Sequence, residues 1–313
     1  MNSVKKNFQR DEFIKTIYEA ARKNKKIYFL SADFGAPALD NFRLYLKEQF
    51  LHLGICEQNM IDFACGMALE GAKVYAYAMA PFLSLRCLEQ HKTATCLMNA
   101  NVCSIITGIG LSYANSGPTH YSTEDFACLR SLSNCIIYTA SDPEVAKCIA
   151  KKTLKINAPI FVRLDRKSSN NLLKKISIKD INIGFRYLKK SSKKKLLIIS
   201  HGTIIERAVT AEEKLDREYG NSIDIVDLIQ SKPFPKKLKN ILKKYSQIMT
   251  IDEQTSEGSL GSLIKENIDH HAKIKSLSLP DKFIFENLGR DKLLDSNGLS
   301  INNISKEIIN LIS

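Results

Sequence analysis

Short apolar segments alternate with stretches of helical periodicity along most of this chain, and this alternation restricts the fold more than any other feature. The predicted strands of the first half are 27–31, 50–53, 73–78, 102–107, 134–138 and 159–164, and the predicted helices include 10–23, 61–69, 85–99 and 143–156. Strands that alternate with helices of about 10 to 15 residues are typical of a parallel sheet covered by helices on both faces. The sequence therefore predicts an α/β fold.

A polar, lysine-rich stretch at residues 166–194 interrupts this pattern and is typical of a linker between domains. Further predicted strands follow at 196–200, 223–228 and 247–252, with helices at 204–217, 235–244 and 300–312. The chain has 313 residues, enough for two domains that each bury a core. We predict a first domain at 8–168, a linker at 169–192 and a smaller second α/β domain at 193–313.

Composition excludes several common classes of protein. The chain has no apolar run of about 18 residues, so we expect no membrane-spanning helix. Its first residues, MNSVKKNFQRDEF, lack the apolar core of a secretory signal. The eight cysteines lie between Cys56 and Cys148, with no Cys-x-x-Cys pair and no histidine at metal-ligand spacing. We therefore expect free thiols and a cytoplasmic location.

The formal net charge of +13 comes largely from lysine clusters late in the chain, at 189–190, 193–195, 236–237 and 243–244. No aromatic side chains are interleaved with these lysines, as binding to single-stranded nucleic acid would require. The pattern indicates a solvated, lysine-rich surface. The alternative is a surface on which an acidic partner subunit docks. We expect no nucleic-acid ligand.

Glu57 is the most informative single residue. It lies in Gly-Ile-Cys-Glu-Gln-Asn, between a predicted strand and a helix rich in small residues that ends near Gly71. A carboxylate at the start of a helix usually serves as a cap or interacts with the helix dipole. The spacing alone therefore favours a structural role.

The blocks around Glu57 change this interpretation. Ser-Ala-Asp at 31–33, Gly54 to Met60, Gly-Pro-Thr-His at 117–120, the Arg-Ser-Leu to Asp-Pro-Glu run at 130–144 and Gly-Ser-Leu-Gly-Ser at 258–262 follow one another along the chain. In sequence and in order they resemble the transketolase family, over nearly the whole chain but only the C-terminal half of a full-length transketolase. The resemblance implies a domain that binds the pyrimidine of thiamine diphosphate, followed by a transketolase C-terminal domain.

The resemblance also implies roles for four residues. Glu57 matches the glutamate that gives a proton to N1′ of the aminopyrimidine, which makes the 4′-imino group a base. A carboxyl group in a mostly apolar pocket can keep such a proton. Phe82 matches an aromatic residue that stacks on the pyrimidine. His120 matches a histidine that faces the reactive carbon and the donor hydroxyls, and Asp33 matches an aspartate near the cofactor. The alternative roles are structural: Phe82 as an ordinary core residue, His120 as a structural histidine and Asp33 as the cap of a turn.

Arg166 matches the family arginine that binds the substrate phosphate, and its planar guanidinium suits bidentate binding of a phosphate. Arg163 is an alternative for the same role, and a surface salt bridge between Asp165 and Arg166 would be structural. In transketolases a histidine stands twelve residues before the histidine of Gly-Pro-Thr-His, where this chain has Gly108. In that family an acidic pair precedes Gly-Pro-Thr-His, and these two positions are Asn115 and Ser116 in this chain. These groups contact donor hydroxyls, so the resemblance implies a specialised substrate, as in surface-polysaccharide synthesis.

No Gly-Asp-Gly motif, which holds Mg²⁺ and the diphosphate in this superfamily, occurs in the sequence, and no metal site is expected in the chain. We therefore predict one subunit of a split enzyme. Its partner is an N-terminal-type subunit that carries Gly-Asp-Gly and holds Mg²⁺, and self-association would give a heterotetramer.

The predicted reaction is transfer of a two-carbon ketol unit from a ketose phosphate to an aldose. Three alternatives remain open. These are a 1-deoxyxylulose-5-phosphate synthase-like enzyme, a 2-oxoacid dehydrogenase beta-like subunit and a non-catalytic scaffold subunit.

Overall fold

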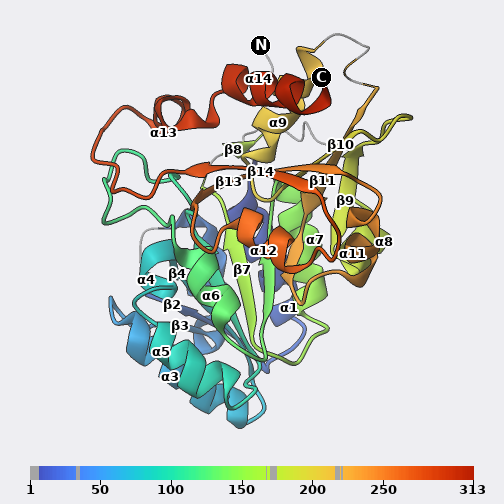
Figure 1. Ribbon diagram of the computed structural model, residues 1–313. Helices are drawn as coiled ribbons and strands as arrows, with labels where there is room; N and C mark the ends of the chain where they lie inside the picture. The colour runs from blue at the N-terminus through green and yellow to red at the C-terminus, as the bar shows by residue number, and fades with distance from the viewer. Residues whose placement is uncertain (1–6, 33–35, 167, 170–174, 216–218, 220) are drawn as a thin grey trace, which may run out of the picture.

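The computed structural model describes residues 7–32, 36–166, 168–169, 175–215, 219 and 221–313, and contains two large sheets (Figure 1). The first sheet has seven strands in the order β12-β6-β7-β5-β4-β2-β3. Its strands are β2 (Ile27–Ser31), β3 (Phe50–His52), β4 (Lys73–Met79), β5 (Val102–Thr107), β6 (Ile136–Thr139), β7 (Ile160–Leu164) and β12 (Gln230–Lys232). All neighbouring pairs are parallel except β12 with β6.

Helices cover both faces of the first sheet. On one face α1 (Gln9–Ala21) and α7 (Pro143–Thr153) bury Phe13, Ile17 and Ile149 against the strands. On the other face lie α3 (Glu57–Leu69), α4 (Ala80–Leu83), α5 (Leu88–Gln90), which continues as a π-helical turn to Cys96, and α6 (Asp125–Ser131). Because both faces are buried, the strands are almost uniformly apolar, as in other parallel sheets.

The second sheet lies above the first in Figure 1 and has five strands in the order β14-β13-β10-β11-β9. They are β9 (Phe185–Lys189), β10 (Leu196–Ser200), β11 (Ile223–Leu228), β13 (Gln247–Thr255) and β14 (Lys273–Leu279), of which only β9 is antiparallel. Its helices are α9 (Ile205–Glu213), α11 (Lys236–Leu242), α12 (Leu260–Glu266), α13 (Arg290–Leu294) and α14 (Ile301–Ile312). Further described elements include α2 (Asp40–Tyr45) and the short strands β1 (Asn7–Phe8) and β8 (Ser168–Ser169). Two mostly parallel α/β sheets confirm the predicted fold class.

The segment expected to be a linker, 169–192, carries regular structure in its described part. Ser177 and Asp180 form a capping box that starts α8 (Ile178–Ile183). Gly184, with φ of +85°, ends this helix and leads directly into β9. The linker prediction took the many polar residues as a sign of irregular structure. The capping residues order the segment, together with Phe185, which is buried against β10 and β11 of the second sheet.

Among the described residues, no helix is long and apolar enough to cross a membrane. All eight cysteines are free thiols, as expected.

Asp252 in β13 gives folding stability a predictable dependence on pH. Its carboxyl is buried beside His201, with Oδ2 3.8 Å from Nε2, and accepts a hydrogen bond from the Leu260 amide at 2.7 Å. Burial raises the pKa of Asp252 to about 7, and burial also lowers the pKa of His201 well below its usual value. Between about pH 4 and pH 7 the unfolded chain therefore ionises Asp252 while the folded chain keeps it protonated.

Ionisation of Asp252 in the unfolded chain therefore lowers stability as pH rises through this window, while the buried histidines His201 and His91, whose pKa values are lowered, contribute stability that increases with pH up to about 6.5. Asp252→Asn should remove only the Asp252 contribution, since asparagine resembles the protonated acid. The slope of the unfolding free energy against pH, measured in urea from about pH 4.5 to 7, should be more positive in the variant than in the wild type. The difference in slope should reach about 1.4 kcal/mol per pH unit. Identical slopes would show that Asp252 is ionised in the folded protein.

Candidate active site

The predicted site residues gather at one edge of the first sheet. Glu57 follows β3, Phe82 follows β4, His120 lies in the loop after β5, and Arg166 lies just beyond β7. Since the carboxyl ends of parallel strands meet at the same edge, residues far apart in the sequence come together there.

Glu57 is the first residue of α3, and its side chain is 4% exposed. Its Oε2 accepts a hydrogen bond of 2.7 Å from Nη1 of Arg86. The pocket is therefore not the mostly apolar one that we expected, because a half-exposed guanidinium covers the carboxylate. Among the described residues, no hydrogen bond reaches the second oxygen, Oε1.

A continuous series of ring and cation contacts joins the predicted residues. The guanidinium of Arg86 lies 4.3 Å from the centre of the Phe82 ring, and this ring meets His120 edge to face at 5.4 Å. The ring centres of His120 and Tyr113 are 6.4 Å apart. The guanidinium carbon of Arg166 lies over the Tyr113 ring, 4.8 Å from its centre. Glu57, Phe82, His120 and Arg166 thus lie along one path.

Sequence reasoning missed the two residues that complete this path, Arg86 and Tyr113. Arg86 is a cation close in sequence to Phe82, and this proximity was a usable signal. Tyr113 is the one aromatic residue between Gly108 and Gly117, which could also have drawn attention to it.

Tyr113 also explains the glycine at position 108. Gly108 has φ of +90°, and a Cβ atom placed on it would lie 2.0 Å from Cε2 of Tyr113. The ring of Tyr113 therefore fills the space that a side chain at position 108 would need. Asn115 and Ser116 are exposed in the same loop.

Arg163 does not lie on this path, and its surroundings argue against a phosphate-binding role. It is 1% exposed and donates from Nε and Nη2 to the two oxygens of Asp125, at 2.6 and 3.1 Å. Its Nη1 donates to Thr139 at 3.0 Å. The guanidinium is thus enclosed by protein partners, whereas Arg166 is exposed.

Asp165 does not form the surface salt bridge considered as an alternative. It is completely buried, and its partners include Arg290, Ser112 and Thr203. Asp33 lies outside the described residues, so its predicted place near the cofactor stays a prediction.

The residues described around Glu57 suit the aminopyrimidine of thiamine diphosphate. A buried carboxylate with Oε1 available and the ring of Phe82 nearby are the groups that a protonatable heterocycle needs. Within the described part of the chain, no three His, Cys, Asp or Glu side chains are grouped to hold a metal ion.

Two family models match the chain. The one described as "Transketolase, pyrimidine binding domain" matches residues 9–171, and "Transketolase, C-terminal domain" matches residues 186–304. The chain belongs to the transketolase family. Membership confirms the predicted pair of domains and implies thiamine diphosphate as the cofactor.

Individual relatives in the transketolase family cover the chain to different extents. The 1-deoxy-D-xylulose-5-phosphate synthase of Bacillus velezensis is 31% identical over 292 residues, which are 91% of this chain but 45% of that protein. One subunit of the apulose-4-phosphate transketolase of Phocaeicola vulgatus is 26% identical over 90% of this chain and 93% of that protein. The chain therefore spans about half the length of the synthase and nearly all of the transketolase subunit.

A solved structure described as "Split gene transketolase, inactive beta4 tetramer" shares the fold. Its TM-score is 0.85 at 24% sequence identity, and the match covers 97% of this chain and 98% of that chain.

Proposed function

We propose that this chain is the C-terminal-type subunit of a split, thiamine diphosphate-dependent transketolase-like enzyme. It would transfer a two-carbon ketol unit from a ketose phosphate to an aldose. The path of contacts from Glu57 through Phe82 and His120 to Arg166 is the observation that carries this proposal. It supplies a proton-transferring acid, an aromatic wall, a hydrogen-bonding imidazole and a phosphate-binding cation, in that order.

When bound, thiamine diphosphate supplies the nucleophilic carbon that cleaves the ketose. Glu57 would hold a proton next to the pyrimidine nitrogen, and Oε1 is the oxygen available for it. Phe82 would pack against the ring. His120, whose Nδ1 lies 2.9 Å from Oγ1 of Thr119, would orient the substrate hydroxyls with its other nitrogen.

The partner in this proposal is an N-terminal-type subunit that carries Gly-Asp-Gly and holds Mg²⁺ with the diphosphate. The Phocaeicola relative, named as one subunit of a transketolase and matched over 93% of its length, supports a two-subunit arrangement. Large apolar side chains are exposed around Glu57 and along the neighbouring π-helical turn, as expected where another polypeptide docks. They are Ile55, Phe63, Leu97 and Met98, which are 83%, 44%, 72% and 51% exposed. Pairing of two such heterodimers would give a heterotetramer.

Arg166 would bind the substrate phosphate, and Tyr113 would shape the donor site. Tyr113 fills the space beside Gly108, where transketolases carry a histidine for donor hydroxyls. A donor with a different hydroxyl pattern, as in a specialised or surface-polysaccharide pathway, fits this change.

Arg166→Met should raise KM for a phosphorylated substrate about 10- to 100-fold, because a charge-assisted contact to the phosphate is lost. The change should be small for the unphosphorylated sugar, and kcat should change less than KM. Steady-state kinetics of the reconstituted enzyme would measure both. Arg22→Met, an exposed arginine at the end of α1, is the matched control. An unchanged KM in the Arg166 variant would contradict the assignment.

A 1-deoxyxylulose-5-phosphate synthase-like reaction is the second candidate, favoured by 31% identity to a synthase and by the altered donor-contacting groups. The Gly-Pro-Thr-His block argues against a 2-oxoacid dehydrogenase beta-like subunit, and Glu57 argues against a non-catalytic scaffold subunit. Assays of the reconstituted subunit pair with ketose phosphates and with pyruvate, each with an aldose phosphate, separate the reactions. Ketol transfer without pyruvate consumption is the expected result. No turnover, with no thiamine diphosphate binding by calorimetry, would favour the scaffold.

A further inference from the structure

The loop that carries Tyr113 and His120 is closed at its base. It leaves β5 at Gly108 and returns at Ser122. Gly110 and Ser122 exchange two backbone hydrogen bonds of 3.0 Å, which form an isolated antiparallel bridge. The position of the two side chains therefore depends on where this base is held.

The carboxyl end of β13, in the second domain, holds this base. Glu253 accepts a hydrogen bond from the Leu111 amide at 3.2 Å through Oε2, and Gln254 Nε2 donates to the Ser122 carbonyl at 3.0 Å. A Cβ atom on Gly110 would lie 2.7 Å from Cβ of Glu253, so the glutamate packs directly on this backbone.

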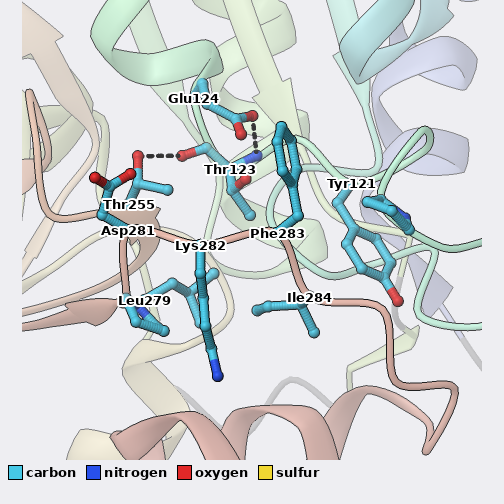
Figure 2. Close-up of a pocket in the computed structure, with 11 residues that line it drawn as sticks. Tyr121, Thr123, Glu124, Thr255, Leu279, Asp281, Lys282, Phe283 and Ile284 are labelled. Atoms are coloured by element: carbon cyan, nitrogen blue, oxygen red, sulfur yellow. Dashed lines mark hydrogen bonds between the residues drawn. The ribbon is translucent and has the colours of Figure 1, made fainter.

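Thr255 extends this contact by one residue, since its amide donates to the Thr123 carbonyl at 2.9 Å. The two threonines lie on the wall of a pocket of about 270 Å³, between the loop and Phe283 (Figure 2). Three consecutive residues of β13 thus contact the base of the loop.

Arg290, at the start of α13, links this base to the strand end next to Arg166. Its Nη2 donates to Oε1 of Glu253 at 2.6 Å, and its Nη1 donates to Oδ1 of Asp165 at 2.9 Å. Asp165 immediately precedes Arg166 and also accepts a hydrogen bond of 2.8 Å from Ser112 in the loop. Arg290, Glu253 and Asp165 have side-chain exposures of 13%, 7% and 0%.

We propose that Glu253, bridged by Arg290 to Asp165, is a positioning residue through which the second domain fixes His120 and Tyr113 relative to Arg166. The guanidinium of Arg290 holds the base of the loop and the end of β7 together. Buried ion pairs with several hydrogen bonds fix the relative positions of the segments they join when each polar partner is satisfied. This inference deepens the proposed function, and its kinetic part rests on it.

The first test compares Glu253→Gln with Asp227→Asn. The second variant neutralises a carboxylate that pairs with buried Arg186 at 2.9 Å, next to Ser141 of the first domain, and so matches the first in chemistry and burial. Hydrogen exchange of the full chain, followed by mass spectrometry, should show about tenfold faster exchange at 109–122 in Glu253→Gln, because a hydrogen bond to a charged group is weakened. Asp227→Asn should leave this segment at the wild-type rate.

Equal exchange of 109–122 in both variants would overturn the proposal. If Glu253→Gln does not fold, Arg290→Lys replaces it, since lysine keeps the charge but cannot bridge two carboxylates with a planar fork. The same acceleration is then expected.

The second test is kinetic. In the reconstituted enzyme, Glu253→Gln should lower kcat/KM about 10- to 100-fold because His120 is misplaced, and Asp227→Asn should not. A loosened loop with wild-type kcat/KM would overturn the positioning role. If the wild-type pair turned over neither ketose phosphate nor pyruvate, the proposed function would fail instead, while the exchange experiment would still decide how the loop is held.

Discussion

Replacing Glu57 with alanine should reduce turnover at least about 1,000-fold and weaken thiamine diphosphate binding in the reconstituted enzyme, because the variant has no acid to protonate the pyrimidine nitrogen. The effect on stability should be small. Arg86, the partner of Glu57, has 41% of its side chain exposed, so water can solvate the cation that the substitution leaves unpaired. Steady-state rates and calorimetric titration with the cofactor would measure the two effects.

The carboxamide variant Glu57→Gln keeps the shape of the side chain but removes its acidic proton. It should be nearly as inactive as the alanine variant. Glu70→Gln, at the exposed far end of α3, is the matched control and should retain wild-type rates. Wild-type turnover by Glu57→Gln would rule out proton transfer from this residue and, with it, the proposed use of the cofactor.

Replacing Arg163 with methionine should lower the free energy of unfolding by about 3–5 kcal/mol, because the substitution leaves Asp125 as an unpaired carboxylate in the core. Both side chains are almost fully buried, at 1% and 0% exposure. Urea denaturation at pH 7 would measure this loss.

Arg130→Met is the control for this prediction. Arg130 also forms a bidentate pair, with Glu266 at 2.7 and 2.5 Å, but the carboxylate is 55% exposed, so the loss should not exceed about 1 kcal/mol. Similar losses in both variants would show that burial does not govern the cost. A higher KM for phosphorylated substrates in a stable Arg163 variant would return the phosphate role to Arg163.

Residues in the segments that follow a predicted strand could be placed at one edge of the sheet from the sequence. Glu57, Phe82 and His120 each follow an apolar segment that had to form a buried parallel strand, and the edge where they meet follows from this topology. The sequence did not distinguish the roles of Arg163 and Arg166, which lie three residues apart around the end of one strand. Which of them faces protein and which faces solvent depends on Asp125, 38 positions away from Arg163.

Contacts through space account for what the sequence could not supply. The pairing of Arg86 with Glu57 and the packing of Tyr113 against Gly108 depend on the conformations of two loops. The contact between Glu253 and Leu111 joins residues 142 positions apart, across two domains. The ordered part of the expected linker was missed because its capping residues are short polar ones that also occur in loops.

Strand β12 has a consequence for any attempt to divide this polypeptide. Although it follows β9, β10 and β11 of the second sheet along the chain, it completes the first sheet by pairing Gln230 with Tyr138 and Lys232 with Ile137. A truncated protein ending near residue 192 would leave β6 with an unprotected hydrogen-bonding edge, which favours aggregation. The two halves are therefore expected to melt in a single cooperative transition, and limited proteolysis should not release a stable N-terminal piece.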